Sequence, residues 1–566
     1  MYLGTRLIEL LEKQHRSRQS ELFKKGVFTL QWRAKVGSFP HPDIETIVSA
    51  GEPCGAWQPS HSRPEAKRNV GENLQQLPTL PLNGYIPGSA IRGIVRAWAK
   101  KRSHIKPRMY ELLGYQEQDT ISSGKIEFLD AWSEQPSKLT LDIVNPQQEF
   151  QVYHQGQSTP LSFYTLGDGK TPIGITVAIR GVPGRATPAE VNEVWEWVQQ
   201  ALSLYGVGSR TASGYGTFKP PSDFRPSTEL RAPDPDYASK QFEFSLYSQG
   251  SAGVDPRTME LRPVHWRGWL RSWVLRFLLG VMSQQDAETT IGELFGTLEP
   301  KSLKGCVRLQ MTKGELWKEL SENEPDFYTW QGKLKLSAPS DILNKIILPI
   351  VKFAVMVGGV GKGWRRPLHI FQMNTGRSAA RGTHLFLTHQ VRNRDSGNNE
   401  TKSFGLKPTA EAWQQEYENW QQVVRSQWSN RFRVNSNPNL KAEIFSPNNC
   451  AVYILPAPEQ EPINRQNLEW DITNSVATRG KGMDLIYNPQ YKRKNDVGGS
   501  AAGGGNAYCS WVSIKRVKIR NRQEKTDCQE IVCLFMGDKN DLRSRFLRDL
   551  ANMSGAVHLF GVKPTL

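Results

Sequence analysis

Cysteine is scarce in this chain of 566 residues, which contains six, at positions 54, 306, 450, 509, 528 and 533. Small disulfide-stapled folds need a denser and more regular cysteine pattern, so we exclude a disulfide framework and expect a reducing compartment. No Cys-x-x-Cys pair occurs, and we expect no structural zinc. His41, Cys54 and His61 would have to converge from separate loop positions to hold a metal, and ordinary loop residues explain them better.

Long apolar runs are also missing. No segment approaches the roughly 20 apolar residues of a membrane span. Residues 1–25 are charged and lack the apolar core of a secretory leader. We therefore expect a cytoplasmic protein with no membrane partner. The glycine-rich segments lack the Gly-x-x-x-x-Gly-Lys-Ser/Thr spacing of a P-loop, so that kind of phosphate site is not expected.

Acidic residues are outnumbered, since 55 Asp and Glu stand against 72 Lys and Arg and give a net charge of +17. A field of this sign favours a polyanionic partner. The alternative is a soluble protein whose basic balance has no function. The 17 tryptophans and 48 glycines favour nucleic acid, because aromatic rings stack on bases and glycines let the backbone approach phosphates.

One constellation of residues occurs twice, and such a repeat sets the domain count. The segments 86–98 and 261–273 each contain Arg-Gly, an arginine three residues after that glycine and a tryptophan two residues further on. Leu112-Leu113-Gly114 follows the first copy and Leu294-Phe295-Gly296 follows the second, with another glycine ten and nine residues later. We therefore expect two copies of one domain.

The expected fold class is α+β, because strand-like alternation and helical periodicity both occur along each copy. The first copy has strand patterns at 28–34, 124–129 and 173–180, and helical patterns at 90–102, with Ser89 as N-cap, and at 188–205. The second copy has a strand pattern at 241–247 and a helical pattern at 264–279. The expected divisions are a first domain at 1–220 with a long insertion at 36–84, a proline-rich linker at 221–239, a second core at 240–379 and a C-terminal region at 380–566.

Two glycine-rich loops, 206–216 and 358–366, lie downstream of the repeated blocks. Backbone N–H groups in such loops bind anions, and neighbouring cations add charge. One loop of this kind is weak evidence, whereas two in a basic chain predict binding of nucleic acid. The residues expected to contact RNA here are Gly208, Arg210, Gly214 and Gly216 in the first loop, and Gly361, Lys362, Arg365 and Arg366 in the second.

The region 380–566 is open to three interpretations: an insertion, the completion of the second domain, or a module that docks a partner. Within it, a strand pattern at 514–520 puts Arg516, Lys518 and Arg520 on one face. A basic ladder suits a phosphate backbone, so these residues are RNA-binding candidates. An edge strand kept soluble by its charges explains the same pattern equally well.

The Ile-Pro-Gly-Ser-Ala-Ile-Arg-Gly block at 86–93 and the loop at 206–216 resemble the RAMP superfamily, the repeat-associated proteins that form the backbone of type III CRISPR effector complexes. The block at 261–271, with the Glu-Leu-Phe-Gly at 293–296, is similar to another branch of that superfamily. The resemblance implies two tandem ferredoxin-like (RRM-like) domains, a projecting thumb hairpin, and a first helix that grips the guide RNA (crRNA) together with the glycine-rich loop. The residues that match the guide-contacting helix start are Gly88, Ser89, Arg92 and Arg96 in the first copy, and His265, Arg267 and Arg271 in the second.

Target-cleaving members of this family place an aspartate between the first strand and the first helix, where it helps Mg²⁺ promote attack by the adjacent ribose 2′-hydroxyl. Asp43 is the only aspartate in that loop of the first copy, and amides stand at 75–76 where the acid is expected, which favours an inactive first copy. Asp255, in a Gly-x-Asp-Pro setting, is the stronger catalytic and metal-binding candidate. The alternative is that Asp255 caps a turn before Pro256.

The leading hypothesis is a guide-binding subunit of a type III CRISPR ribonucleoprotein in antiviral defence, with complementary target RNA and other effector subunits as partners. If Asp255 is catalytic, the chain also contributes Mg²⁺-dependent cleavage of the target at one site. A non-catalytic capping subunit of the same complex is the second hypothesis. A stand-alone guide-processing endoribonuclease is the third, and it would need an acid and base pair such as His104 and Tyr110, which nothing in the sequence joins.

Overall fold

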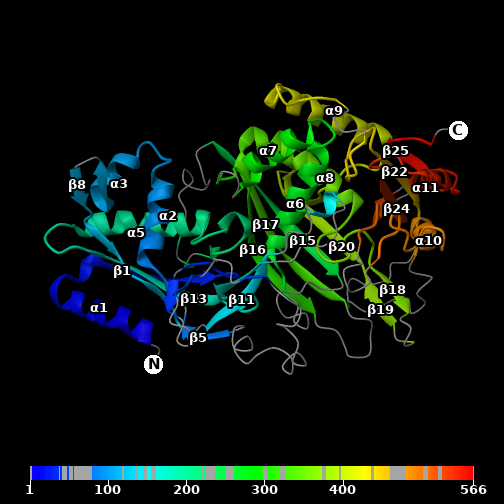
Figure 1. Ribbon diagram of the computed structural model, residues 1–566. Helices are drawn as coiled ribbons and strands as arrows, with labels where there is room; N and C mark the ends of the chain where they lie inside the picture. The colour runs from blue at the N-terminus through cyan, green and yellow to red at the C-terminus, as the bar shows by residue number, and fades with distance from the viewer. Residues whose placement is uncertain are drawn as a thin grey trace.

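Three antiparallel sheets lie in a row in the computed structural model, and they make this an α+β protein (Figure 1). Within the described ranges, every helix is too short or too polar to span a bilayer. The structure describes residues 3–36, 38–40, 47–49, 55–56, 79–83, 85–117, 120–135, 138–144, 150–153, 161–219, 221–222, 224, 236–248, 260–297, 302–318, 327–372, 376, 378–393, 397–434, 439–458, 479–500, 508–520 and 526–564.

The first sheet has the strand order β14-β1-β13-β10-β6, with β9 also paired to β13. Along β13, Ile175, Val177 and Ile179 point to one face, where they pack against helices α2 and α5. The elements are β1 (Phe23–Leu30), β6 (Tyr85–Ile86), α2 (Gly88–Ala99), β9 (Ile126–Phe128), β10 (Ala131–Ser133), β13 (Ile173–Gly181), α5 (Pro188–Tyr205) and β14 (Phe218–Lys219).

Helix α1 (Leu3–Gln19) covers the opposite face of this sheet, as Figure 1 shows below β1. Ile8 of α1 packs there against Phe23 and Ala178, which alternate with the residues that face α5. A short turn, η1 (Ser20–Leu22), joins α1 to β1. Helix α3 (Lys106–Leu113) and the hairpin β7 (Gly114–Glu117) and β8 (Thr120–Ser123) complete the first unit.

The long insertion expected at 36–84 contributes strands to a second, smaller sheet of the first unit. This insertion sheet has the order β4-β12-β11-β5 and combines β4 (Gly55–Ala56) and β5 (Thr79–Asn83) with β11 (Lys138–Val144) and β12 (Leu161–Leu166). A separate hairpin, β2 (Ser38–Pro40) with β3 (Ile47–Ser49), lies in the same insertion. The turn η5 (Gln151–Tyr153) leaves β11 and buries Val152 completely in the core of the other two large sheets.

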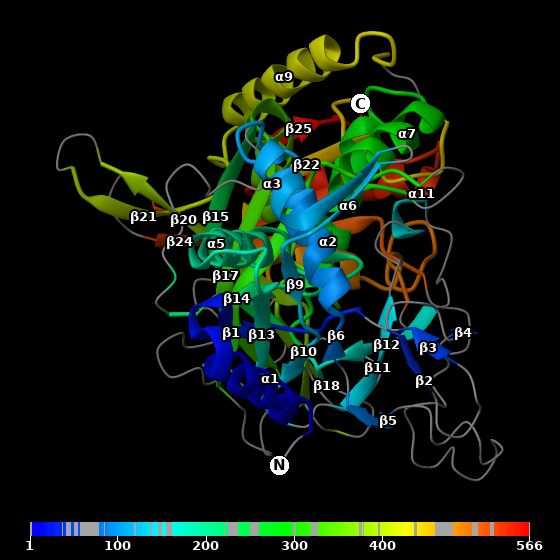
Figure 2. The ribbon, with the colours of Figure 1, turned by 90° about the vertical axis from the view of Figure 1, so that its left-hand side faces the viewer.

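The second large sheet has the order β16-β17-β15-β20-β21. Figure 2 shows the β20–β21 hairpin projecting beyond the body of the molecule. The elements are β15 (Tyr237–Ser248), α6 (Pro263–Leu278), α7 (Gln284–Phe295), β16 (Arg308–Lys318), β17 (Tyr328–Pro339), η8 (Ile342–Ile347), α8 (Leu348–Val357), the hairpin β18 (His369–Gln372) and β19 (Ser378–Arg381), β20 (Thr383–Arg392), β21 (Asn399–Ser403) and α9 (Ala410–Gln427).

The C-terminal region divides between two sheets. Strands β20 and β21 belong to the second large sheet, whereas the residues from 450 onward form a third sheet of order β23-β24-β22-β25. Its elements are β22 (Cys450–Pro456), α10 (Lys481–Tyr487), β23 (Val512–Arg520), β24 (Thr526–Phe535), α11 (Asp541–Ala551) and β25 (Val557–Gly561). This third sheet is a finding that the sequence interpretation left open.

The same pairing order recurs in all three large sheets. In each, the chain runs strand, helix, strand, strand, helix, strand, and the first strand lies between the third and the fourth. The strands that occupy these first positions are β1, β15 and β22. We call the three repeats the first, second and third units.

Both junctions between consecutive units use the same kind of contact. Gln310 of β16 donates to the carbonyl of Leu204 near the end of α5, over 3.1 Å. Ser513 of β23 donates to the carbonyl of Val357 at the end of α8, over 2.5 Å. The last carbonyls of a helix have no partners within the helix. At each junction, a polar side chain on the second strand of one unit donates to such a carbonyl on the second helix of the preceding unit.

Candidate nucleic-acid interface

The repeated arginines of the first unit lie beside the end of α3. Arg92 donates to the carbonyl of Leu113, and Arg96 donates to the carbonyls of Leu113 and Gly114. These carbonyls have no helical partner, and Gly114 has a positive φ of 74°. The arginine pair is therefore a side-chain cap for this helix.

The second unit repeats this cap with its own residues. Arg267 donates to the carbonyl of Phe295, and Arg271 donates to the carbonyl of Gly296 over 3.0 Å. Gly296 also has a positive φ, of 84°. The repeated sequence block therefore corresponds to a repeated helix cap. RNA contact by these four arginines stays a prediction for the guanidinium N–H groups that the cap does not use.

The start of α2 differs from the sequence prediction. The helix begins at Gly88, so Ser89 lies inside it and is not the N-cap. The Gly88 N–H, which was expected to bind a phosphate, donates over 2.8 Å to Asp130 of the same chain. That prediction for Gly88 is wrong, because a carboxylate already occupies its donor, whereas Ser89 is exposed and stays a candidate.

His265 does not supply the positive charge expected at the start of α6. Burial, followed by the nearby Arg262, lowers the pKa of His265 to about 3. The imidazole is therefore neutral at physiological pH. It can accept or donate a hydrogen bond, but it adds no charge to a phosphate site.

The first glycine-rich loop is packed tightly against its surroundings. Gly208, Gly214 and Gly216 all have positive φ values. A Cβ atom at Gly214 would collide with Pro263 at the start of α6, and Gly216 donates its N–H to the Arg33 carbonyl over 2.7 Å. Both glycines are buried, so direct RNA contact by Gly214 and Gly216 is wrong.

The outer part of that loop faces solvent. Gly208 and Ser209 are exposed and Arg210 is half-buried, with its own φ at +58°. The Ser209 N–H donates to the Lys35 carbonyl over 3.0 Å, which joins the loop to the segment that follows β1. Gly208 and Arg210 therefore remain candidates for RNA contact. The hydrogen bond from Ser209 anchors the loop that carries them.

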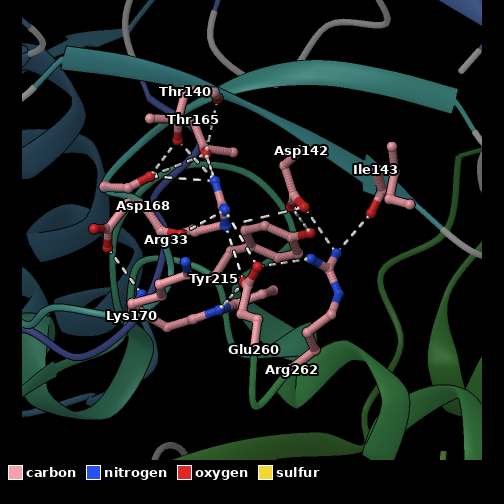
Figure 3. A network of polar contacts seen from close by, with 12 residues as sticks. Arg33, Thr140, Asp142, Ile143, Thr165, Asp168, Lys170, Tyr215, Glu260 and Arg262 are labelled. Atoms are coloured by element: carbon pink, nitrogen blue, oxygen red, sulfur yellow. Dashed lines mark hydrogen bonds and ion pairs between the residues drawn. The ribbon is translucent and has the colours of Figure 1, made fainter. Parts of the chain in front are cut away.

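A buried charged network supports this loop, and Figure 3 shows its side chains. Arg33 reaches both carboxylate oxygens of Glu260, over 3.0 and 3.2 Å, and Arg262 donates to Asp142 over 2.8 Å and to Glu260 over 3.2 Å. Two guanidinium groups thus meet two carboxylates across the junction of the first and second units. We call these four residues the junction network.

Neighbouring groups complete the hydrogen bonds of the junction network. Trp32 donates to Glu260 over 2.6 Å and Tyr215 donates to Asp142 over 2.5 Å. Burial would raise the pKa of Asp142, but Arg262 and Arg33 outweigh it and hold that pKa well below its usual value. Sequence reasoning missed the network, although Glu260 directly precedes the repeated block and Arg262 is its second residue, a signal that could have suggested it.

Lys35 lies beneath the loop in an unusual state. Its side chain is 1% exposed, and its Nζ atom has no hydrogen-bond partner among the described residues. The amine instead lies 2.7 Å from the ring centre of Phe163 and 3.9 Å from that of Tyr215. Burial, only partly offset by Asp142, lowers the pKa of Lys35 to about 5.

The second glycine-rich loop contains both exposed and buried cationic side chains. Gly361 has open space around it at a φ of 82°, and Lys362 is exposed, so both stay RNA-binding candidates. Arg365 is buried against Glu443, which it shares with Arg276.

Arg366 lies beside this pair and donates to Ser510 over 2.9 Å and to the Val512 carbonyl. Arg365 and Arg366 therefore join the second unit to the third. Arg365 is buried, so the prediction that it contacts RNA is wrong, whereas Arg366 is half-buried and its RNA contact stays a prediction.

One of the three basic residues predicted to form a ladder on β23 does not face solvent. Arg516 is 2% exposed and lies 3.8 Å from Glu530, so it faces the interior and not a phosphate backbone. The side chains of Lys518 and Arg520 lie outside the described residues, and their RNA contact stays a prediction.

The catalytic candidates cannot be placed. Asp43 and Asp255 lie outside the described residues, as do His41, Cys54 and His61. In the described part of the chain, no group of three or more His, Cys, Asp or Glu side chains could hold a metal ion. His104 is exposed, and Tyr110 packs edge-on against Tyr115 at 5.9 Å.

Comparison with known families identifies the first unit. Residues 67–219 match the family model of the RAMP superfamily. This segment of the chain is similar to that superfamily. The RAMP segment includes α2, α5 and the first glycine-rich loop, together with β11 and Asp142 of the junction network. No curated protein matches the chain.

Two solved structures are similar to parts of this chain. Cmr6 from Pyrococcus furiosus is 19% identical over 35% of this chain and 97% of its own, with a TM-score of 0.19. A chain of a CRISPR RNA-guided surveillance complex is 9% identical over 36% of this chain and 72% of its own, with a TM-score of 0.21. Scores of this size carry no argument, so the assignment to the superfamily rests on the sequence match.

The helix cap gives a first prediction. Replacing Arg271→Met removes the donor from the half-buried Gly296 carbonyl and should lower the free energy of unfolding by about 0.5–1.5 kcal/mol, the usual net contribution of a hydrogen bond. Urea unfolding followed by tryptophan fluorescence measures this. Lys407→Met, at an exposed lysine, is the control and should change little. Equal midpoints for both variants would contradict the capping role.

The junction network gives a second prediction. Glu260→Gln leaves Arg33 and Arg262 to share Asp142, and breaking a buried ion pair in this way should cost about 3–5 kcal/mol. The urea midpoint should fall accordingly. The matched control is Glu243→Gln, whose pair with Lys333 at 3.3 Å is 44% exposed on both sides and should contribute under about 1 kcal/mol. A fall no larger than that of the control would count against the network.

Lys35 gives a prediction on pH. Its pKa of about 5 in the folded chain lies below the 10.5 of a free lysine. Between those values the unfolded chain binds a proton that the folded chain does not, so the contribution of Lys35 to stability rises with pH. Lys35→Met removes this dependence. Its melting temperature should exceed that of the natural chain by more at pH 6 than at pH 9, and a constant difference would refute the buried neutral amine.

Proposed function

We propose that this chain is a guide-RNA-binding subunit of a type III CRISPR ribonucleoprotein effector, built from three ferredoxin-like units. The observation that carries the proposal is the match of residues 67–219 to the RAMP superfamily. The matched segment includes the first helix and the glycine-rich loop, the two elements that the family uses to hold a guide. Complementary target RNA and other CRISPR effector subunits are the partners that follow from this assignment.

The strand order supports the ferredoxin-like part of the proposal. A ferredoxin-like unit pairs its first strand with its third and fourth, and β1, β15 and β22 all hold that central position. The third unit, from β22 to β25, extends the proposal beyond the two copies that the sequence repeat indicated.

The charge distribution supports RNA as the ligand. The chain carries a net charge of +17, and the two glycine-rich loops present Arg210 and Lys362 outside the buried networks. An exposed cation beside backbone N–H groups with positive φ neighbours is a suitable contact for a phosphate. The loops are anchored, so little ordering entropy is lost when RNA binds.

A non-catalytic capping subunit of the same complex is the second candidate. It is favoured by the number of repeated cations that hold the protein together: Arg92, Arg96, Arg267 and Arg271 cap helices, and Arg365 joins two units. Asp255 and Asp43, the candidate Mg²⁺ ligands, lie outside the described residues.

RNA binding is tested by fluorescence anisotropy with a labelled single-stranded RNA at several salt concentrations. Arg210→Gln and Lys362→Gln should each weaken binding uniformly across sequences and reduce the salt slope by about 1. Lys539→Gln, at an exposed lysine of the third unit, is the control and should leave the slope unchanged. Binding that is absent, or insensitive to both loop variants, would refute the proposed interface.

Catalysis is tested in the same complex after co-expression with its guide and partner subunits. With Mg²⁺ and a complementary RNA, loss of one cut in Asp255→Ala, with RNA binding intact, would make the second unit a nuclease, and the same result in Asp43→Ala would implicate the first. An unchanged pattern in both variants supports the capping role. Cleavage of hairpin RNA by the isolated chain would instead favour the guide-processing enzyme.

A further inference from the structure

A cluster of basic side chains lies where the β20–β21 hairpin leaves the second sheet, the projection seen in Figure 2. His389 of β20 and Lys402 of β21 are direct cross-strand partners, so both side chains point to the same face. Lys240 lies two residues before Phe242 on β15 and so shares its face of the sheet, where the ring of Phe242 packs against Phe404. Lys352 lies on α8. Burial, and then these three lysines, lower the pKa of His389.

The floor of this cluster is apolar. The Phe404 ring lies 5.1 Å from the imidazole of His389 and 4.7 Å from the ring of Phe242. The Nδ1 atom of His389 is buried and has no hydrogen-bond partner within the described residues. With Nδ1 buried beside the Phe404 ring, a ligand of His389 has to be reached through the other ring nitrogen, Nε2.

The acids around the cluster do not balance its charge. Lys352 pairs with Glu416 of α9 over 2.7 Å, and Lys402 pairs with Glu400 of β21 over 3.3 Å. Lys240 is half-buried and forms no ion pair in the described part of the chain. Three ammonium groups thus face two carboxylates, and one positive charge is left beside the neutral imidazole.

We propose that Lys240, His389 and Lys402 form a binding site for one phosphate group of an RNA backbone. The RNA as source rests on the proposed function, whereas the phosphate site rests on the cluster itself. A phosphodiester carries one negative charge, equal to the unbalanced charge of the cluster. Ammonium and imidazole N–H groups donate to its oxygens, and such charge-assisted hydrogen bonds are stronger than neutral ones.

The first test is the titration of His389 in the full chain, followed by NMR with ¹³C-labelled histidine. The His389→Gln variant identifies the signal. A bound phosphate places a negative charge next to the imidazole, so single-stranded RNA should raise the protonation constant of His389 about tenfold or more. A titration unchanged by both RNA and inorganic phosphate overturns the site.

The source of the phosphate is decided by comparing ligands in the same titration. A shift with inorganic phosphate or adenosine monophosphate but not with RNA retains a phosphate site and refutes the RNA backbone as its ligand. If the chain binds no RNA in the anisotropy assay, the proposed function fails. Inorganic phosphate then still tests the cluster independently.

The second test uses affinity. Lys240→Gln should reduce the salt slope of RNA binding by about 1, as expected when one phosphate contact is removed. Lys345→Gln is the matched control, because Lys345 lies on η8, is 57% exposed and pairs with Asp341. A slope for Lys240→Gln equal to that of the natural chain overturns the contact between RNA and the cluster.

Discussion

Buried arginine side chains need carboxylate partners, and this requirement joins the three units. A guanidinium without a counter-charge inside a protein is strongly destabilising, so each arginine at a junction fixes the position of an acid from another part of the chain. Arg33 of the first unit meets Glu260 at the entrance of the second, and Arg276 and Arg365 of the second unit share Glu443. The glycine-rich loops lie directly over these pairs. Their exposed residues are therefore presented from a rigid base.

Local sequence signals predicted the elements that depend on local interactions. The pattern at 188–205 coincides with α5, because Thr187 and Glu190 form a capping box and a proline occupies the first turn. The insertion sheet and the third unit were not predicted. Strands β4 and β5 pair with β12 and β11, whose residues are far along the chain, and no short window carries that information. The third unit lacks the repeated arginine block, and its α10 has only seven residues.

For the candidate interface, the sequence indicated the residue types but not where their side chains lie. Lys362 and Arg365 are three residues apart in one basic loop, yet Lys362 is exposed and Arg365 is buried against Glu443. Glu443, the partner of Arg365, lies 78 positions further along the chain. The composition of the loop therefore could not distinguish the buried Arg365 from the exposed Lys362. The repeated arginines show the same limit, because a helix cap and a phosphate contact both require a guanidinium at the same spacing.

Val152 links the order of synthesis to the order of folding. The residue belongs to a turn of the first unit, but its side chain is buried in the core of the second and third units, and its carbonyl accepts the N–H of Glu443 over 2.7 Å. Val152 precedes β22 by nearly 300 residues, so a first unit that folds during translation leaves this side chain without the core that buries it in the full chain. Exposed apolar surface on a first unit made alone is therefore a consequence of where this one turn is buried in the complete chain.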